Sequence, residues 1–228
     1  LESKEQRLRS GDRDNLARYS EANRSDGAPK PGETRVVFLG DSITDGWRLN
    51  EYFPSKPYVN RGIGGQITGE MLGRLKADVL DLKPAAVVLL AGTNDLARDV
   101  VLPTIQNNLT MIADLLAAYR IKPVFASILP IHDYHKDKDP SFERSLQRPP
   151  DSILAMNKWI QALCQQRGYL HLDYFAAMVD EKGFLKAELA DDGLHPNAAG
   201  YRIMGPLAQA AIDRALGPPA KPKRGKKS

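Results

Sequence analysis

The chain has 228 residues, of which 42% are hydrophobic, and this is enough to build one substantial core. No apolar run approaches the roughly 20 residues that span a bilayer, so we expect no membrane insertion. The formal net charge of +4 comes from the end of the chain, because five lysines and arginines lie between Lys221 and Lys227. The rest is close to neutral, which argues against a basic nucleic-acid-binding face and indicates a solvated tail.

We expect one domain over residues 35–216, preceded by an N-terminal arm over residues 1–34 and followed by a disordered basic tail over residues 217–228. The arm is polar and contains a possible short helix over residues 13–23. Cys164 is the only cysteine, so no intramolecular disulfide can form, and its helical setting predicts a buried thiol. The sequence starts without an initiator Met or a signal segment, which fits a trimmed form of a secreted or periplasmic protein.

From Val36 onward, short apolar runs alternate with helical patterns. In chain order we expect strands at 36–39 and 57–60, a helix at 66–80, a strand at 85–91, a helix at 103–119, a strand at 122–128, a helix at 151–167, a strand at 169–173 and a helix at 197–215. Such alternation is typical of a parallel sheet with helices on both faces.

Residues 131–150 form a long, charged stretch without periodicity, directly after the strand expected at 122–128. Loops longer than about 12 to 15 residues in compact domains are usually functional or disordered. We therefore predict that this segment is a substrate-shaping lid over the carboxyl edge of the sheet.

Polar residues follow several of the expected strands, where ligands and nucleophiles sit in open α/β sheets. Gly40-Asp-Ser42 follows the first strand, a glycine-rich loop ending at Gln66 follows the second, and Asn94 follows the third. Far downstream, Asp192-Gly-Leu-His195 supplies a carboxylate and an imidazole. A serine nucleophile needs a base, and the base needs a group that fixes its tautomer, so these segments contain the parts of a serine hydrolase.

Together, a GDS serine, a glycine, a G-x-N-D asparagine and a D-x-x-H pair occur here in the order found in the SGNH hydrolases, also called the GDSL esterases and lipases. The chain resembles this superfamily from about Arg35 to Ala215, although Ile43 stands where leucine is common. The resemblance implies a flavodoxin-like three-layer α/β/α sandwich with a five-stranded parallel sheet in the order 2-1-3-4-5. It also implies a serine esterase that works through an acyl-enzyme.

The resemblance assigns Ser42 as nucleophile and His195 as general base, with Asp192 orienting the imidazole. Asp191 is adjacent, and only the D-x-x-H spacing of the family selects Asp192. For Ser42 the structural alternative is an N-cap, and His195 with the following proline also fits a helix entry.

The same resemblance places an oxyanion hole at the backbone amides of Ser42 and Gly65 and the side-chain amide of Asn94. Gly65 could instead be no more than a turn glycine. The glycine run does not complete a dinucleotide-binding G-x-G-x-x-G, because Ile67 occupies its last position.

Three residues are candidates for substrate binding: Trp47 after the serine turn, and His132 and Tyr134 in the 131–150 segment. Trp47 could equally be a core residue. His132 and His135 have the spacing of metal ligands, but no third or fourth ligand is evident, and we expect neither a metal nor another cofactor.

We therefore predict an esterase that acts on small-molecule or carbohydrate acyl esters with short chains, in particular acetyl esters. Two alternatives remain open. One is a lysophospholipase or thioesterase with the same catalytic groups, and the other is a polysaccharide-binding module that has lost turnover.

Overall fold

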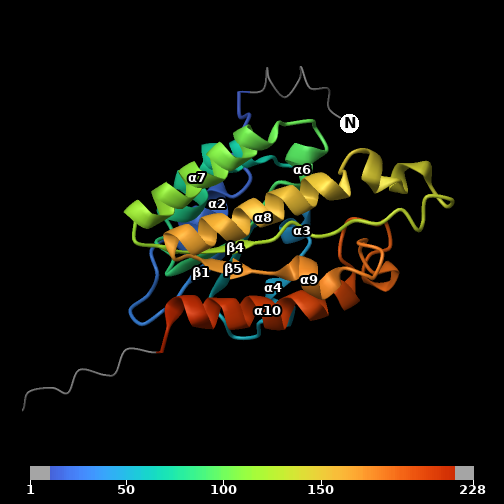
Figure 1. Cartoon of the computed structure of the whole chain (residues 1–228). Helices are drawn as coiled ribbons and strands as arrows, with labels where there is room; N and C mark the ends of the chain where they lie inside the picture. The colour runs from blue at the N-terminus through green and yellow to red at the C-terminus, as the bar shows by residue number, and fades with distance from the viewer. Residues whose placement is uncertain (1–10, 219–228) are drawn as a thin grey trace, which may run out of the picture.

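The computed structural model describes residues 11–218, so nearly all of the expected basic tail lies outside the described residues. Five parallel strands form one sheet in the order β2-β1-β3-β4-β5, which confirms the expected topology (Figure 1). The strands are β1 (Val36–Gly40), β2 (Tyr58–Gly62), β3 (Ala86–Leu90), β4 (Lys122–Ala126) and β5 (Leu170–Leu172).

Helices cover both faces of the sheet, as Figure 1 shows, with α7 and α8 on one side and α10 on the other. The α-helices are α2 (Ser20–Asp26), α3 (Ser42–Asp45), α4 (Leu49–Tyr52), α5 (Thr68–Leu75), α6 (Thr93–Leu96), α7 (Leu102–Ala118), α8 (Pro150–Arg167), α9 (Tyr174–Met178) and α10 (Ala198–Leu216). A π-helical turn, η1 (Lys76–Leu80), extends α5, and the 3-10 turns are η2 (Pro140–Phe142), η3 (Arg144–Leu146) and η4 (Ala187–Leu189).

Successive residues of the strands face opposite sides of the sheet, and each side has its own apolar core. Val37 and Leu39 pack with the layer that contains α5, α7 and α8, whereas Val36 and Phe38 pack with the layer that contains α4, α9 and α10. This is why β1 is an uninterrupted apolar run, since a strand buried on both faces has no polar side. Cys164 is buried on α8, as its helical setting predicted. Burial raises the pKa of its thiol to about 12.

The helix expected over residues 13–23 is wrong in its bounds, because α2 begins only at Ser20. Asn15 has a φ of 58°, which interrupts a right-handed helix, and the Asp12 carboxylate accepts hydrogen bonds from the amides of Leu16 and Ala17. Residues 11–19 of the arm therefore form a series of turns.

The arm packs against the loop that follows β2, which carries Gly65. The Tyr19 hydroxyl donates a hydrogen bond to the Gly62 carbonyl, and the Gln66 side chain donates to the Asp14 carbonyl at 3.1 Å. Arg61 on β2 forms an ion pair with Asp26 at 2.6 Å. These contacts join residues 14–26 of the arm to β2 and to the glycine-rich loop.

A fully buried arginine connects the same loop to the end of β1. Arg74 donates hydrogen bonds to the Gln66 side chain at 2.6 Å, to Asp78 at 3.0 Å and to the Gly40 carbonyl at 3.1 Å. Burial lowers the pKa of Arg74, and the hydrogen bond that Arg74 donates to Asp78 opposes that effect. Since every polar group in this cluster has a partner, the charge can remain buried.

Within residues 11–218, no helix is both long and apolar enough to cross a membrane.

Candidate active site

The chain turns sharply from β1 into α3 and thereby exposes Ser42 at the carboxyl end of the sheet. A Cβ added at Gly40 would lie 2.2 Å from the Thr44 hydroxyl and 2.7 Å from the Leu90 carbonyl, so only glycine fits there. The N-cap of α3 is Asp41, whose carboxylate accepts the Ile43 amide at 2.9 Å. Ser42 is therefore not the cap, which removes the structural alternative for its hydroxyl.

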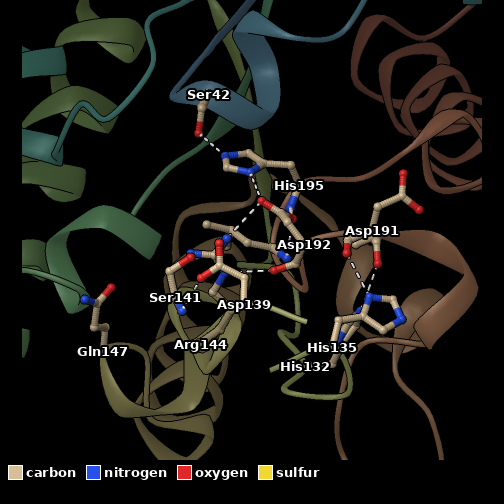
Figure 2. Close-up of polar contacts among 12 residues, drawn as sticks. Ser42, His132, His135, Asp139, Ser141, Arg144, Gln147, Asp191, Asp192 and His195 are labelled. Carbon is tan, nitrogen blue, oxygen red and sulfur yellow. Dashed lines mark hydrogen bonds and ion pairs between the residues drawn. The ribbon is translucent and has the colours of Figure 1, made fainter. Parts of the chain in front are cut away.

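The side chains of Ser42, His195 and Asp192 form one hydrogen-bonded row, although Ser42 lies far from the other two in sequence. The Ser42 hydroxyl lies 2.8 Å from His195 Nε2, and His195 Nδ1 lies 2.7 Å from Asp192 Oδ2 (Figure 2). The side chain of Asp191 instead accepts a hydrogen bond from Asn197 at 3.2 Å. The geometry thus separates the two adjacent aspartates, and Asp192 is the one that contacts the imidazole.

Asp192 fixes both the position and the tautomer of His195. Its Oδ1 accepts the backbone amides of Leu194 at 2.9 Å and His195 at 2.8 Å, which holds the carboxylate in its own turn. Because Oδ2 can only accept, His195 Nδ1 carries the proton and Nε2 is free to accept the serine proton. Burial alone would raise the pKa of Asp192, but the hydrogen bonds from His195 and Leu194 hold it well below its usual range. The carboxylate is therefore charged at neutral and mildly acidic pH.

Asp41 is a second, fully buried carboxylate beside Ser42. Burial raises its pKa to about 6, although the Ile43 amide and the charges of His195 and Arg148 act in the other direction. One of its oxygens has no hydrogen-bond partner in the described part of the chain. Because the pKa of Asp41 is raised in the folded state, its buried charge lowers the stability of the fold above about pH 6. This cost is relieved as the pH falls through about 6 and Asp41 becomes protonated.

The glycine loop after β2 lies directly against the serine. A Cβ built on Gly64 would be 3.8 Å from the Ser42 Cβ, and the Gly64 amide donates to Asp45 at 3.2 Å. Gly65 has a φ of 77°, and its amide has no partner among residues 11–218. Gly65 is therefore a turn glycine that also leaves a backbone donor unused near Ser42.

Asn94 lies at the start of α6, after β3, and is 8% exposed. Its side-chain nitrogen donates one hydrogen bond to the Gln66 carbonyl at 3.1 Å, and its oxygen accepts from Arg148 at 3.4 Å. An amide nitrogen has two protons, so the second has no partner in the described structure. Asn94 is thus oriented from both sides, with one donor left over.

The structure corrects two of the three expected substrate contacts. Trp47 is 3% exposed and stacks on Tyr201, with ring centroids 5.3 Å apart, so it belongs to the core. His132 is fully buried, with Nε2 bonded to the Ala190 carbonyl and Nδ1 accepting the Tyr134 amide. Neither ring reaches a surface where a substrate could bind, and both His132 nitrogens are already in use.

Tyr134 remains a prediction as a substrate contact. It is 39% exposed, its ring stacks on His132 at 5.2 Å, and its hydroxyl donates to Asp180. This hydrogen bond raises the pKa of Tyr134 to about 12.

The 131–150 segment, predicted to be a lid, is fastened to the turn that carries Asp192 and His195. The His132 amide donates to the Gly193 carbonyl at 2.9 Å, and the His135 ring lies 2.8 Å from the Asp191 carbonyl (Figure 2). A Cβ at Gly193 would lie 2.2 Å from the His132 carbonyl oxygen, so this close approach requires glycine. The segment also brings Arg144 and Arg148 to the site, and sequence reasoning missed both because nothing in an aperiodic loop marks one arginine over another.

A shallow cavity of about 180 Å³ lies between α4 and the start of α10. Its lining combines charged and amide side chains with two tyrosines, and it includes the residue that follows His195. The lining residues are Gly46, Arg48, Glu51, Tyr52, Pro196, Asn197, Ala198 and Tyr201.

The chain is similar to known acylhydrolases in both sequence and structure. The profile of the GDSL-like lipase/acylhydrolase family matches residues 38–203. An acetylxylan esterase from Geobacillus stearothermophilus is 25% identical, with 75% of this chain and 90% of that protein aligned. An uncharacterised lipoprotein from Bacillus subtilis is 31% identical over 44% of this chain and 50% of its own length. The crystal structure of a GDSL-like lipase from Bacteroides thetaiotaomicron is 33% identical and superimposes with a TM-score of 0.80, covering 89% of this chain and 99% of the other.

Proposed function

The chain belongs to the GDSL-like lipase/acylhydrolase family, and we propose that it uses Ser42 to hydrolyse short-chain acyl esters through an acyl-enzyme. The observation that carries this proposal is the 2.8 Å contact between the Ser42 hydroxyl and His195 Nε2, with Asp192 on the other ring nitrogen. A serine placed this way can be deprotonated as it attacks, which it cannot achieve unaided near neutral pH.

In the first half-reaction, the Ser42 oxygen attacks the ester carbonyl carbon while its proton passes to His195 Nε2. The carbonyl oxygen becomes negatively charged and is stabilised by the amides of Ser42 and Gly65 and the free N–H of Asn94. When the intermediate collapses, His195 returns the proton to the departing alcohol and an ester bond to Ser42 remains. Water then attacks that ester with His195 again as base, which releases the carboxylic acid and restores the serine.

The substrate class we propose is acetyl esters, including those of carbohydrates. The aligned acetylxylan esterase supports it. The alternative on the same catalytic groups is a lysophospholipase or thioesterase.

A panel of p-nitrophenyl esters from acetate to decanoate, together with acetylated xylan and acetylated simple sugars, tests the substrate class. We expect kcat/KM to be highest for acetate and to fall as the acyl chain lengthens, and we expect release of acetate from the sugars. A kcat/KM that rises toward decanoate would support the lysophospholipase or thioesterase alternative instead.

Asn94→Ala tests the oxyanion hole. Removal of one such donor costs about 10²- to 10³-fold in rate, so kcat for p-nitrophenyl acetate should fall by that factor while KM changes little. The matched control is Asn107→Ala on the exposed side of α7, which should behave as wild type. An Asn94→Ala variant that loses affinity but keeps kcat would show that the side chain binds substrate in its ground state only.

We also propose that the protein is exported from the cytoplasm, because polymeric acetylated carbohydrates occur outside the cell. The partly aligned lipoprotein from Bacillus subtilis supports it. Detection of the protein only in the cytoplasmic fraction of the source cells would contradict it.

A further inference from the structure

The 131–150 segment supplies a cation that contacts the aspartate of the serine–histidine–aspartate row. Arg144 Nη2 lies 3.0 Å from Asp192 Oδ2, and Arg144 Nε lies 2.9 Å from the Asp192 backbone carbonyl (Figure 2). Oδ2 is also the oxygen that accepts His195 Nδ1. One guanidinium therefore holds both the side chain and the backbone of the residue that orients the imidazole.

The backbone donors to Asp192 cannot fix its position relative to the rest of the protein. The amides of Leu194 and His195 bind Oδ1 and belong to the turn itself, so they move with it. Arg144 is the donor that reaches Asp192 from a different element. The side chains of Arg144 and Asp192 are only 15% and 25% exposed, which limits screening of the pair by water. Because the Arg144 guanidinium is planar and rigid, its two hydrogen bonds fix the orientation of Asp192 as well as pairing with its charge.

The segment does not need Arg144 in order to stay docked. His132 remains bonded to the carbonyls of Gly193 and Ala190, the His135 ring to the Asp191 carbonyl, and Arg148 to the Thr93 and Asn94 side chains. Loss of the Arg144 side chain should therefore release Asp192 without releasing the segment.

We propose that Arg144 is a positioning residue that holds Asp192, and through it His195, in line with Ser42. This inference rests on the proposed function, since the row has a catalytic role only if Ser42 is the nucleophile. It adds a fourth member to the row, contributed by a loop that is separate in sequence from the turns carrying Ser42 and Asp192, and it gives the 131–150 segment a role other than that of a lid.

The charges around the row determine what loss of Arg144 should do to its pH dependence. Asp192 faces His195 directly, Arg144 faces Asp192, and the buried Asp41 and Arg148 interact with the same groups at longer range. Removal of the Arg144 cation leaves the local charge more negative, which favours the protonated imidazole. The acid limb of the profile of kcat/KM against pH should therefore move to higher pH.

The test compares Arg144→Ala and Arg144→Lys with Lys136→Ala, which removes a cation and an ion pair from the same segment but does not touch the row. Misalignment at a site can cost up to about 100-fold, so we expect kcat of Arg144→Ala to fall by about 10- to 100-fold with KM little changed. Arg144→Lys should recover part of the loss, and Lys136→Ala should match wild type. Guanidinium ion, well below unfolding concentrations, should partly restore Arg144→Ala only.

The outcomes separate this inference from the function on which it rests. If wild type hydrolyses no ester, the proposed function fails. If wild type is active and Arg144→Ala keeps both its kcat and its pH profile, only the positioning role is overturned. The positioning role would also be overturned by a lower kcat of Arg144→Ala that comes with no shift of the acid limb, no recovery in Arg144→Lys and no response to guanidinium. A purely structural contribution of Arg144 predicts that pattern. Should Arg144→Ala fail to fold, Arg144→Gln removes the same charge while keeping a polar side chain, and it carries the same test through its pH profile.

Discussion

Ser42→Ala should remove essentially all ester hydrolysis, with a loss in kcat of about 10⁶-fold, as found when a serine hydrolase loses its nucleophile. The physical reason is that the Ser42 hydroxyl is the group that contacts His195 Nε2, and no methyl group can attack a carbonyl. The fold should survive because Asp41, not Ser42, caps α3. Steady-state hydrolysis of p-nitrophenyl acetate and thermal unfolding measure the two effects.

The control for this substitution is Ser25→Ala, which removes an exposed hydroxyl from α2. It should leave kcat and KM unchanged. If Ser42→Ala kept a substantial fraction of the wild-type rate at an unchanged unfolding temperature, the proposed mechanism would have to be abandoned.

Asp192→Asn should lower kcat by about 10⁴-fold, with little change in KM. An asparagine can present its amide nitrogen to His195 Nδ1, which favours the tautomer with the proton on Nε2, and that nitrogen then cannot accept the serine proton. The same substitution also removes the charge that pairs with Arg144. Rates across the pH range should show the loss at every pH, since the wild-type carboxylate is already ionised well below neutrality.

The neighbouring residue offers a matched control, because Asp191→Asn makes the same chemical change one position away. The Asp191 side chain contacts Asn197 and does not touch the imidazole, so this variant should stay close to wild type. A larger loss for Asp191→Asn than for Asp192→Asn would mean that the two aspartates have been assigned the wrong way round.

The sheet could be predicted from the chain because its strands are short apolar runs separated by helical patterns. Strands such as β1 and β3 are buried on both faces, and this leaves an unbroken apolar signature that a sequence displays directly. The strand order came from the family resemblance, since the patterns alone do not say which strands are neighbours. The arm was less predictable, because Asn15 in a left-handed conformation interrupts a stretch with helical composition.

The contact between Ser42 and His195 joins residues 153 positions apart, and no local periodicity encodes it. It was predictable only because the order of four short motifs resembles a known superfamily. Side-chain direction was not predictable in the same way. Trp47 follows the serine closely, yet the turn after α3 directs its ring into the core, and His132 lies in a charged loop but is buried by the chain that packs over it. Arg144 looks no different in sequence from other loop arginines, and its role depends on where the loop docks.

The central claim is that Ser42 is a nucleophile activated by His195, and covalent labelling tests it most directly. The intact mass of the protein should increase by one adduct after treatment with a fluorophosphonate, and peptide mapping should place that adduct on Ser42. His195→Ala should react far more slowly, and Ser42→Ala should not react. An adduct at another residue, or ester turnover in a protein that gains no adduct, would contradict the account, and binding of acetylated sugars with neither turnover nor labelling would favour a non-catalytic binding module.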